Sequence, residues 1–297
     1  MNSELQVLDI GVISLYFLAV FSIALFFYFR RNKSNNGQSE DYFLGGKNLA
    51  WWAIGASLFA SNIGSEHLIG LAGAGAKGDF PAAQFEILAS LILLLLGWVF
   101  VPFYMKSGVY TMPEFLEKRY NSWARSYLTW VSIVAYVITK ISVTIAAGGI
   151  VFTALLGINF WTGAILIVLI TGVYTILGGL KVVVYTDFLQ MLVLLGGSIA
   201  ITLYGLGELG GWGELVSKTE SSYLSLWRSA DDTSFPWTGV LLGAPILGVW
   251  YWCTDQFIVQ RVLSAKNIDE GRKGTIFGAF LKLLPVSYTH LTLPTKA

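Results

Sequence analysis

An apolar stretch at residues 49–75 carries polar residues at its centre, and this feature restricts the fold more than any other. The stretch exceeds the roughly 20 residues with which a helix crosses a bilayer. Its centre nevertheless contains Asn62, Gly64, Glu66 and His67. Unpaired polar groups are costly in hydrocarbon, so such a segment persists only where protein or a water-filled cavity covers it. The pattern predicts a spanning helix interrupted at mid-depth, which is typical of a binding site in a secondary transporter.

The composition is that of a membrane protein. Hydrophobic residues make up 55% of the chain and charged residues 12%, which is about half the charged fraction of a usual soluble domain. The net charge of +1 gives no indication of nucleic-acid binding. Cys253 is the only cysteine, so an intrachain disulfide is impossible. The sequence contains no nucleophile elbow, Walker loop or dinucleotide fingerprint, and we do not expect an enzyme.

Seven apolar spans predict an all-α polytopic membrane protein, with one integral membrane domain at residues 1–285. The spans cover residues 8–29, 49–75, 82–104, 127–156, 161–180, 183–206 and 237–262. An eighth span begins near Gly274 and breaks off around Pro285. Residues 286–297 interrupt it with polar and β-favouring residues, so we expect them to be a non-native tail.

The positions of lysine and arginine predict the membrane topology. Glu4 and Asp9 lie at the start of the first span, and three basic residues follow it at positions 30, 31 and 33. Because basic flanks stay in the cytoplasm, the N-terminus is expected outside. The same rule places these later residues in cytoplasmic loops: Lys106, Lys118, Arg119, Arg125, Lys181, Arg261, Lys266, Arg272 and Lys273. The spans and their alternating flanks predict a multi-pass protein, and our hypothesis places it in a bacterial-type plasma (inner) membrane.

A second interruption is predicted in the seventh span, where Pro245 and Gly248 precede an aromatic run at residues 250–252. Interrupted helices in two halves of a chain are the best sequence indication of a transporter site. The alternative is a pair of ordinary packing kinks, because glycine and proline are common in membrane helices. At the first interruption, the backbone carbonyls of Ala60 and Ile63 would suit a hard cation such as sodium, which prefers oxygen ligands.

Charged side chains inside the spans are candidate binding residues. Glu86 lies in the third span and Lys282 in the eighth. A lysine at the membrane centre costs roughly 3 kcal/mol, so such residues normally pair or face a cavity. We expect Glu86 and Lys282 to pair, with extension of Lys282 to the interface as the alternative. Lys140, midway along the fourth span, has no partner or role that the sequence indicates.

Polar and aromatic residues near the interruptions add further candidates. The neutral imidazole of His67 both donates and accepts hydrogen bonds, which suits a polyol substrate; no partner stands at metal-ligand spacing, which excludes a transition-metal site. Tyr251 and Trp252 could place an aromatic face against a sugar ring or simply pack in the core. Asp187 follows a short turn, where the helix dipole favours an acid. A second cation or proton site is the alternative for Asp187.

Three segments resemble the solute:sodium symporter family, and within it the sodium/glucose cotransporter branch. These segments are residues 55–67, 178–190 and 250–261, with support from residues 41–47 and 110–115. The resemblance covers the chain from about residue 8 to residue 285. It implies a LeuT-like inverted-repeat fold with one extra N-terminal helix and an incomplete second repeat. It also implies alternating access driven by the sodium gradient.

The resemblance implies roles for individual residues. Ala60 and Ile63 would give backbone oxygens to sodium, and Asp187 would aid cation release or form a second cation site. The sugar site would be lined by Asn62, His67, Glu86, Tyr251, Trp252 and Lys282. The sequence departs from the branch at two positions: Ile87 stands where the branch commonly has tryptophan, and Gly248 where some relatives have a hydrogen-bonding side chain. These departures leave inositol, another hexose or a related polyol open as the solute.

The sequence thus predicts sodium-coupled symport of a sugar or polyol, either a glucose- or galactose-like hexose or inositol. The expected partners are the solute, sodium as the coupling ion, and the lipid bilayer. The alternative is a non-transporting sugar sensor or a sodium-leak protein on the same fold. If the chain ended at Ala297, we would expect an inactive fragment without coupled transport.

Overall fold

The computed structural model describes residues 7–31, 42–219 and 225–289, and this part of the chain is helical, with two isolated bridges and no strand. The α-helices are α1 (Val7–Arg31), α3 (Trp51–Ala60), α4 (Ser65–Lys77), α5 (Ala83–Leu95), α6 (Val101–Ser107), α7 (Met112–Arg119), α8 (Ser122–Ala135), α9 (Ser142–Leu156), α10 (Phe160–Leu209), α11 (Trp212–Lys218), α12 (Ala244–Val249), α13 (Gln256–Leu263) and α14 (Ile268–Thr289). Short 3₁₀ or π turns are η1 (Gly45–Lys47), η2 (Phe80–Ala82), η3 (Leu96–Phe100), η4 (Tyr136–Ile141), η5 (Gly239–Gly243) and η6 (Trp250–Thr254).

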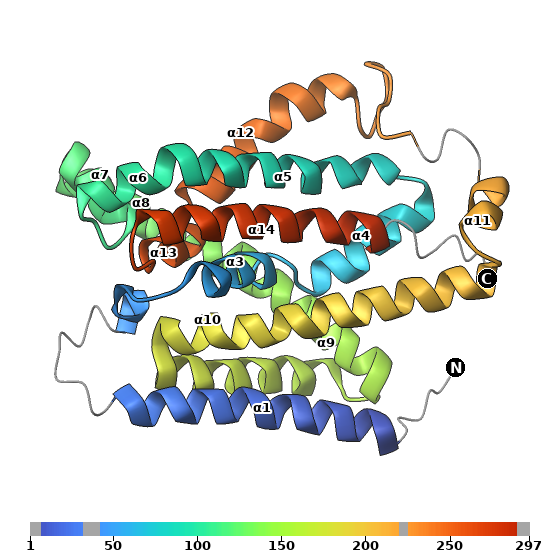
Figure 1. Ribbon diagram of the computed structural model, residues 1–297, viewed down its shortest axis with the longest axis horizontal. Coiled ribbons are helices and arrows are strands. Elements are labelled where there is room, and N and C mark those ends of the chain that lie inside the picture. Colours follow the sequence, from blue (N-terminus) through green and yellow to red (C-terminus); the bar gives the residue numbers. More distant parts are fainter. Residues whose placement is uncertain (1–6, 32–41, 220–224, 290–297) are drawn as a thin grey trace.

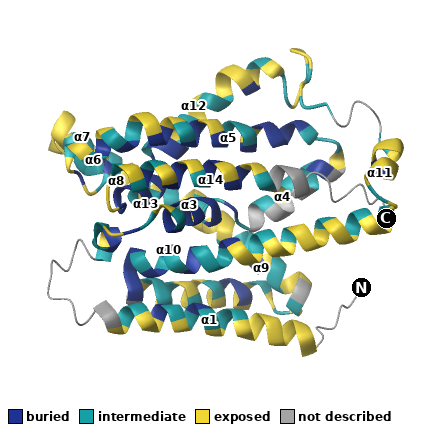
Figure 2. Cartoon of the chain, in the orientation of Figure 1, coloured by how far each residue is buried: buried dark blue, intermediate teal, exposed yellow. Residues whose placement is uncertain are grey.

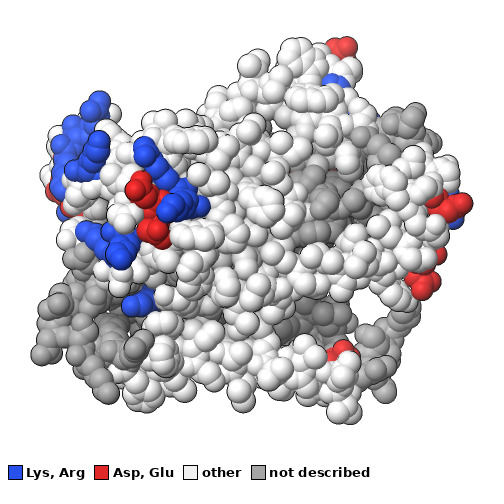
Figure 3. Space-filling model, viewed as in Figure 1, with Lys and Arg blue, Asp and Glu red and all other residues white. Residues whose placement is uncertain are grey.

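The long helices lie side by side in one bundle (Figure 1). Helix α14 lies between α3 and α5, and α10 separates α3 from α1. Many outward faces are apolar and exposed, including Trp130 at 68% and Ile176 at 69% (Figure 2). On the face that Figure 3 shows, charged side chains gather towards the two ends of the bundle, and the surface between them carries none. An apolar girdle of this kind is what a bilayer requires of an integral protein.

The predicted spans correspond to helices in the described residues. Four helices are long and apolar enough to cross a membrane, namely Val7–Phe29, Phe80–Ser107, Ser122–Ala154 and Gly178–Leu209. Shorter apolar helices occupy Trp51–Ala60, Phe160–Ile176 and Gly239–Thr254, within the remaining predicted spans. The eighth span is helical from Ile268 to Thr289, beyond the predicted end near Pro285. The rest of the expected tail, residues 290–297, lies outside the described residues.

The first predicted interruption is confirmed. Helix α3 ends at Ala60, and α4 begins at Ser65 after Gly64, whose backbone is extended (φ −113°, ψ −171°). The regular ladder of i→i+4 hydrogen bonds therefore stops after the N–H groups of Ser61 and Ile63, which bind the carbonyls of Ser57 and Phe59.

The second predicted interruption was placed wrongly. Pro245 and Gly248 both lie inside helix α12, and the chain stays helical until Thr254. The wider π turn η5 directly precedes Pro245, so the proline ring and its missing N–H fall at the first turn of α12, where both are tolerated. The real break is at Asp255, where ψ is 127° and α13 begins.

Glycines bring α3 and α14 into close contact. A Cβ atom on Gly55 would lie 2.7 Å from the carbonyl oxygen of Gly274, and one on Gly278 would lie 3.4 Å from the Cβ atom of Leu58. Small residues allow two membrane helices to approach backbone to backbone. The contacts of Gly55 with Gly274 and of Leu58 with Gly278 follow one another in the same direction along the two helices. One turn further on, Lys282 contacts Asn62.

The turn between the fifth and sixth predicted spans is a single sharp kink within α10. Gly179 has a φ of 62°, and a Cβ atom there would lie 2.7 Å from the carbonyl oxygen of Tyr42. Only glycine suits both requirements. The kink directs the second arm of α10 back along the bundle and sets Asp187 against α3.

Candidate functional site

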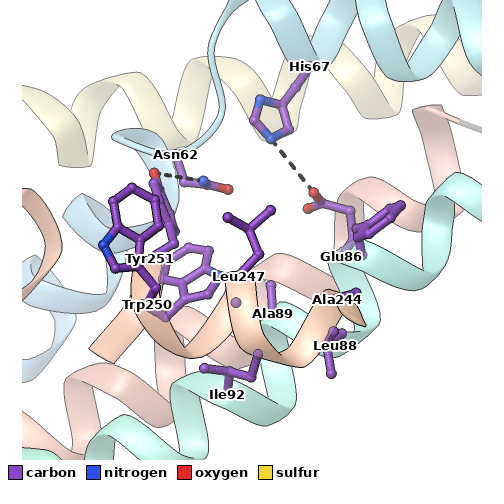
Figure 4. A pocket seen from close by; sticks show the side chains of 13 residues that line it. Asn62, His67, Glu86, Leu88, Ala89, Ile92, Ala244, Leu247, Trp250 and Tyr251 are labelled. Atoms are coloured by element: carbon purple, nitrogen blue, oxygen red, sulfur yellow. Dashed lines mark hydrogen bonds and ion pairs between the residues drawn. The ribbon is translucent and has the colours of Figure 1, made fainter. Parts of the chain in front are cut away.

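A cavity of about 240 Å³ lies between α5 and the α12–η6 segment, next to the interruption between α3 and α4 (Figure 4). Its lining residues come from four places in the chain: Asn62, His67, Phe85, Glu86, Leu88, Ala89, Ile92, Ala244, Leu247, Gly248, Trp250, Tyr251 and Trp252. Five of the six predicted sugar-site residues are among them. The cavity thus brings together residues of the first interruption, of α5 and of the α12–η6 segment, which are far apart in the sequence.

Polar groups face the cavity from opposite sides. The Asn62 side-chain amide donates a hydrogen bond to the hydroxyl of Tyr251, with 3.0 Å between Nδ2 and Oη. On the other side, His67 Nε2 and Glu86 Oε1 lie 3.6 Å apart. An amide, a phenol, an imidazole and a carboxylate together offer both donors and acceptors.

Lys282 is the sixth predicted residue, and it lies behind the cavity wall. Its ammonium group forms an ion pair with Glu86 and a hydrogen bond to the side-chain oxygen of Asn62. The lysine side chain is fully buried, and its charge compensates that of Glu86. The predicted pairing of Glu86 with Lys282 is therefore confirmed. Lys282 therefore contacts two residues that line the cavity, Asn62 and Glu86.

The rest of the wall is apolar and was missed at the sequence level. Phe85, Leu88, Ala89 and Ile92 recur at the i, i+3, i+4 and i+7 spacing of one helix face that also carries Glu86. The sequence signal for them is this helical spacing, which places them on the face of Glu86. Trp250 is half exposed, whereas Trp252 is buried and lies under the Lys282 ammonium, 5.8 Å from its ring centre.

The predicted sodium ligands lie near the cavity but do not line it. Ala60 and Ile63 are both 8% exposed and pack in a cluster with Met191 and Leu281. Because α3 ends at Ala60, its C-terminal carbonyls carry the negative end of the helix dipole. This end of α3 is electrostatically suited to a cation.

Asp187 lies on α10 against α3, in a buried polar cluster. Its Oδ2 atom accepts hydrogen bonds from the hydroxyls of Ser57 at 2.5 Å and Ser61 at 3.0 Å. Arg261 Nη2 lies 3.7 Å from the same oxygen, and Arg261 Nε donates to Ser57 at 2.8 Å. The carboxylate is thus compensated by Arg261, a partner that the sequence did not suggest. A cation that bound Asp187 would compete with Arg261.

Comparisons with known proteins agree with this arrangement. The model of the "Sodium:solute symporter family" matches residues 42–293. The dog (Canis lupus familiaris) sodium/myo-inositol cotransporter is 41% identical over 96% of the chain and 43% of its own length. The sheep (Ovis aries) sodium/glucose cotransporter 1 is 42% identical over 94% of the chain and 45% of its own length. The chain thus spans less than half the length of these curated relatives.

A solved structure gives the same fold. The substrate-bound outward-open state of a Na⁺-coupled sialic acid symporter superimposes with a TM-score of 0.83 at 23% identity. The match covers 98% of this chain and 64% of that one. The predicted all-α transporter fold is therefore confirmed.

Proposed function

Because the chain belongs to the sodium:solute symporter family, we propose that it forms part of a sodium-coupled symporter for an uncharged sugar or polyol. The observation that carries the proposal is the cavity beside the interruption at residues 61–64. Asn62, Glu86 and Tyr251 present hydrogen-bonding groups there, with aromatic rings beside them. A polyhydroxylated solute needs that combination of donors, acceptors and apolar faces.

The charge balance of the cavity supports a neutral solute. Glu86 is paired with Lys282, so the wall carries no uncompensated charge from this pair. A neutral solute leaves the pair intact, whereas an anion would compete with Glu86 for the lysine. Relatives of similar identity are named for glucose and for myo-inositol, and both solutes fit this chemistry.

Sodium would bind at the end of α3. The backbone oxygens of Ala60 and Ile63 are the proposed ligands, because hard cations prefer oxygen and the helix end is negative. Asn62 lies between these two residues in the sequence and binds Tyr251 at the cavity wall. A sodium ion that orders the interruption would therefore also order a sugar-binding side chain. Each ligand would then raise the affinity of the other by the same factor.

The proposed orientation places the N-terminus outside, in the plasma membrane. The C-terminal end of α1, the helix α7 and the beginning of α14 lie at one end of the bundle (Figure 1). Lysines and arginines gather at this end (Figure 3). Basic residues favour the cytoplasmic side.

Uptake by the complete gene product in proteoliposomes tests the proposal. Labelled glucose, galactose and myo-inositol are offered with an inward sodium gradient, and choline replaces sodium in the control. We expect at least one solute to accumulate above its external concentration only with sodium. Uptake that is indifferent to sodium at every solute concentration contradicts the proposal. Solute-evoked current without accumulation would instead indicate a sensor or leak protein.

A further inference from the structure

The second interruption is held by a buried carboxylate. The side chain of Asp255 has no exposed surface and forms an ion pair with Lys140. The hydroxyl of Tyr136 donates to its other oxygen, and the backbone N–H of Phe257 donates to it at 3.0 Å. One side chain thus ties the start of α13 to the π turn η4, which lies about 115 residues earlier.

The same lysine touches the wall of the cavity. Its ammonium group lies 4.9 Å from the ring centre of Tyr251 and 5.1 Å from that of Phe257. A cation over an aromatic face is attracted to it. Tyr251 in turn accepts the hydrogen bond from Asn62. Lys140 therefore connects Asp255, at the break, with the tyrosine that the cavity uses.

The local backbone explains how the contact arises. Lys140 and Tyr136 both lie in η4, and Asp255 directly follows η6, so a π turn lies on each side of the pair. Such turns inside α-helices are rare and are frequent at functional sites. The Asp255 side chain is fully buried, whereas that of Lys140 is 31% exposed, and an ion pair with a buried partner gives little net stability compared with an apolar pair of the same size. Its position at a helix break therefore favours a role in switching over one in stability alone.

We propose that Lys140 and Asp255 are positioning residues that keep the cavity closed towards the end of the bundle where α7 and α13 lie. While the pair is intact, α13 stays against η4 and Tyr251 stays beneath the cavity. Separation of Lys140 from Asp255 would release α13 and Tyr251, and the cavity would open towards the end of the bundle that holds α7 and α13. This inference rests on the proposed transport function, since a transporter must open its cavity to each side of the membrane in turn.

Cys253 supplies a direct measure of opening. It lies two residues before Asp255, has no exposed surface, and its sulfur faces the carbonyl of Ile92. Movement of the break away from α5 would expose its thiol. The rate at which a membrane-permeant maleimide alkylates Cys253, followed by peptide mass spectrometry, therefore reports the open state without any measurement of transport.

The variants are Lys140→Met, which removes the charge at similar length, and Asp255→Asn, which keeps an oxygen for the Phe257 N–H. Lys140→Arg is the conservative variant, and Lys118→Met is the control, since Lys118 pairs with Glu114 on the surface at 3.3 Å. Ala83→Cys, at a fully buried position in α5, introduces a thiol that global unfolding would expose.

We expect Lys140→Met and Asp255→Asn each to raise the alkylation rate of Cys253 about tenfold or more. Lys140→Met leaves the buried Asp255 carboxylate without its partner, which favours any state that solvates it, and Asp255→Asn removes the charge that holds Lys140 at the break. Lys140→Arg and Lys118→Met should keep the wild-type rate, and the Ala83→Cys thiol should stay unreactive in every background. Unchanged Cys253 rates, or equal rises at Cys253 and at the introduced thiol, overturn the inference. If the wild-type protein shows no sodium-dependent uptake, the proposed function fails, and the alkylation rates still decide the role of the pair.

Discussion

The ammonium group of Lys282 and the carboxylate of Glu86 form an ion pair that is almost completely removed from solvent, with the two side chains 0% and 8% exposed. Two helices meet in this contact, because Lys282 lies on α14 and Glu86 on α5. Since each charge would be very unfavourable alone in this environment, the pair fixes the distance between the helices beside the cavity. The hydrogen bond from Lys282 to Asn62 extends the restraint to the helix break.

Replacement of either charge should therefore weaken folding and solute binding together. We expect Lys282→Met to lower the free energy of unfolding by about 3–5 kcal/mol, because Glu86 then stays buried without its partner. Both Lys282→Met and Glu86→Gln should also reduce the affinity for solute. Neither change should prevent membrane insertion. The double variant should regain part of the lost stability. Denaturant unfolding in detergent and titration with solute measure these effects.

The control for this prediction is Lys273→Met, since Lys273 forms an exposed pair with Glu270 at 3.9 Å. Exposed pairs contribute about 0–1 kcal/mol, so this variant should resemble the wild type. If Lys282→Met cost no more stability than Lys273→Met, the pair would not fix α5 against α14. Normal solute affinity in both Glu86→Gln and Lys282→Met would remove these residues from the proposed site.

Tyr251→Phe should weaken solute binding and leave the fold intact. The change removes only the hydroxyl that accepts the Asn62 hydrogen bond at 3.0 Å, and the ring remains. The loss of one such bond costs about 1 kcal/mol, which is roughly fivefold in affinity. Titration with solute measures this loss, and Tyr204→Phe is the control because Tyr204 is 72% exposed. Equal affinities for both variants would argue against a role for the Tyr251 hydroxyl in ordering Asn62.

The first interruption and the Glu86–Lys282 pair were predictable from the sequence for the same reason. Polar and charged residues inside apolar spans are so costly that they must be explained by a break or by a partner. Few such residues exist in these spans, so the choice of partners was small. The positions of Asn62, Gly64, Glu86 and Lys282 therefore carried most of the information about the site.

The second interruption shows where this reasoning stops. Pro245 and Gly248 suggested a break, but the π turn η5 absorbs the proline and the helix continues. At the real break, Asp255 pairs with Lys140, which comes from another part of the chain. No local pattern reveals a contact between residues so far apart. The partnership of Asp187 with Arg261 escaped prediction for the same reason.

Gly274→Val should separate α3 from α14. A Cβ atom at Gly274 would lie 2.8 Å from Ile54 Cγ2 and 3.2 Å from the carbonyl oxygen of Trp51. Overpacking of this kind costs about 1–3 kcal/mol, which thermal unfolding measures. Solute affinity should fall as well, since Lys282 lies two turns further along α14. In the control Gly196→Ala, the added Cβ atom meets no atom within 4 Å. A Gly274→Val protein as stable as this control would show that the glycine contact is dispensable.

The two serines beside Asp187 provide the last prediction, because they differ in a single contact. Ser57 donates to Asp187 at 2.5 Å and also accepts from Arg261 Nε at 2.8 Å, whereas Ser61 contacts only the carboxylate, at 3.0 Å. Ser57→Ala leaves the buried Arg261 Nε–H without its acceptor, which costs about 1–3 kcal/mol, and also removes one of the hydrogen bonds to Asp187.

Ser61→Ala removes one of two hydroxyls from a carboxylate that keeps its other partners, so we expect a loss of only about 1 kcal/mol. Thermal unfolding of the two variants, with and without sodium, measures the difference. If Ser61→Ala were the more destabilising change, Ser57 would not link Arg261 to Asp187 as the structure places it. If sodium displaces Arg261 from Asp187, adding sodium should reduce the difference in thermal stability between Ser57→Ala and Ser61→Ala. The reason is that the Arg261 contact, which distinguishes Ser57 from Ser61, is then lost in the wild type as well.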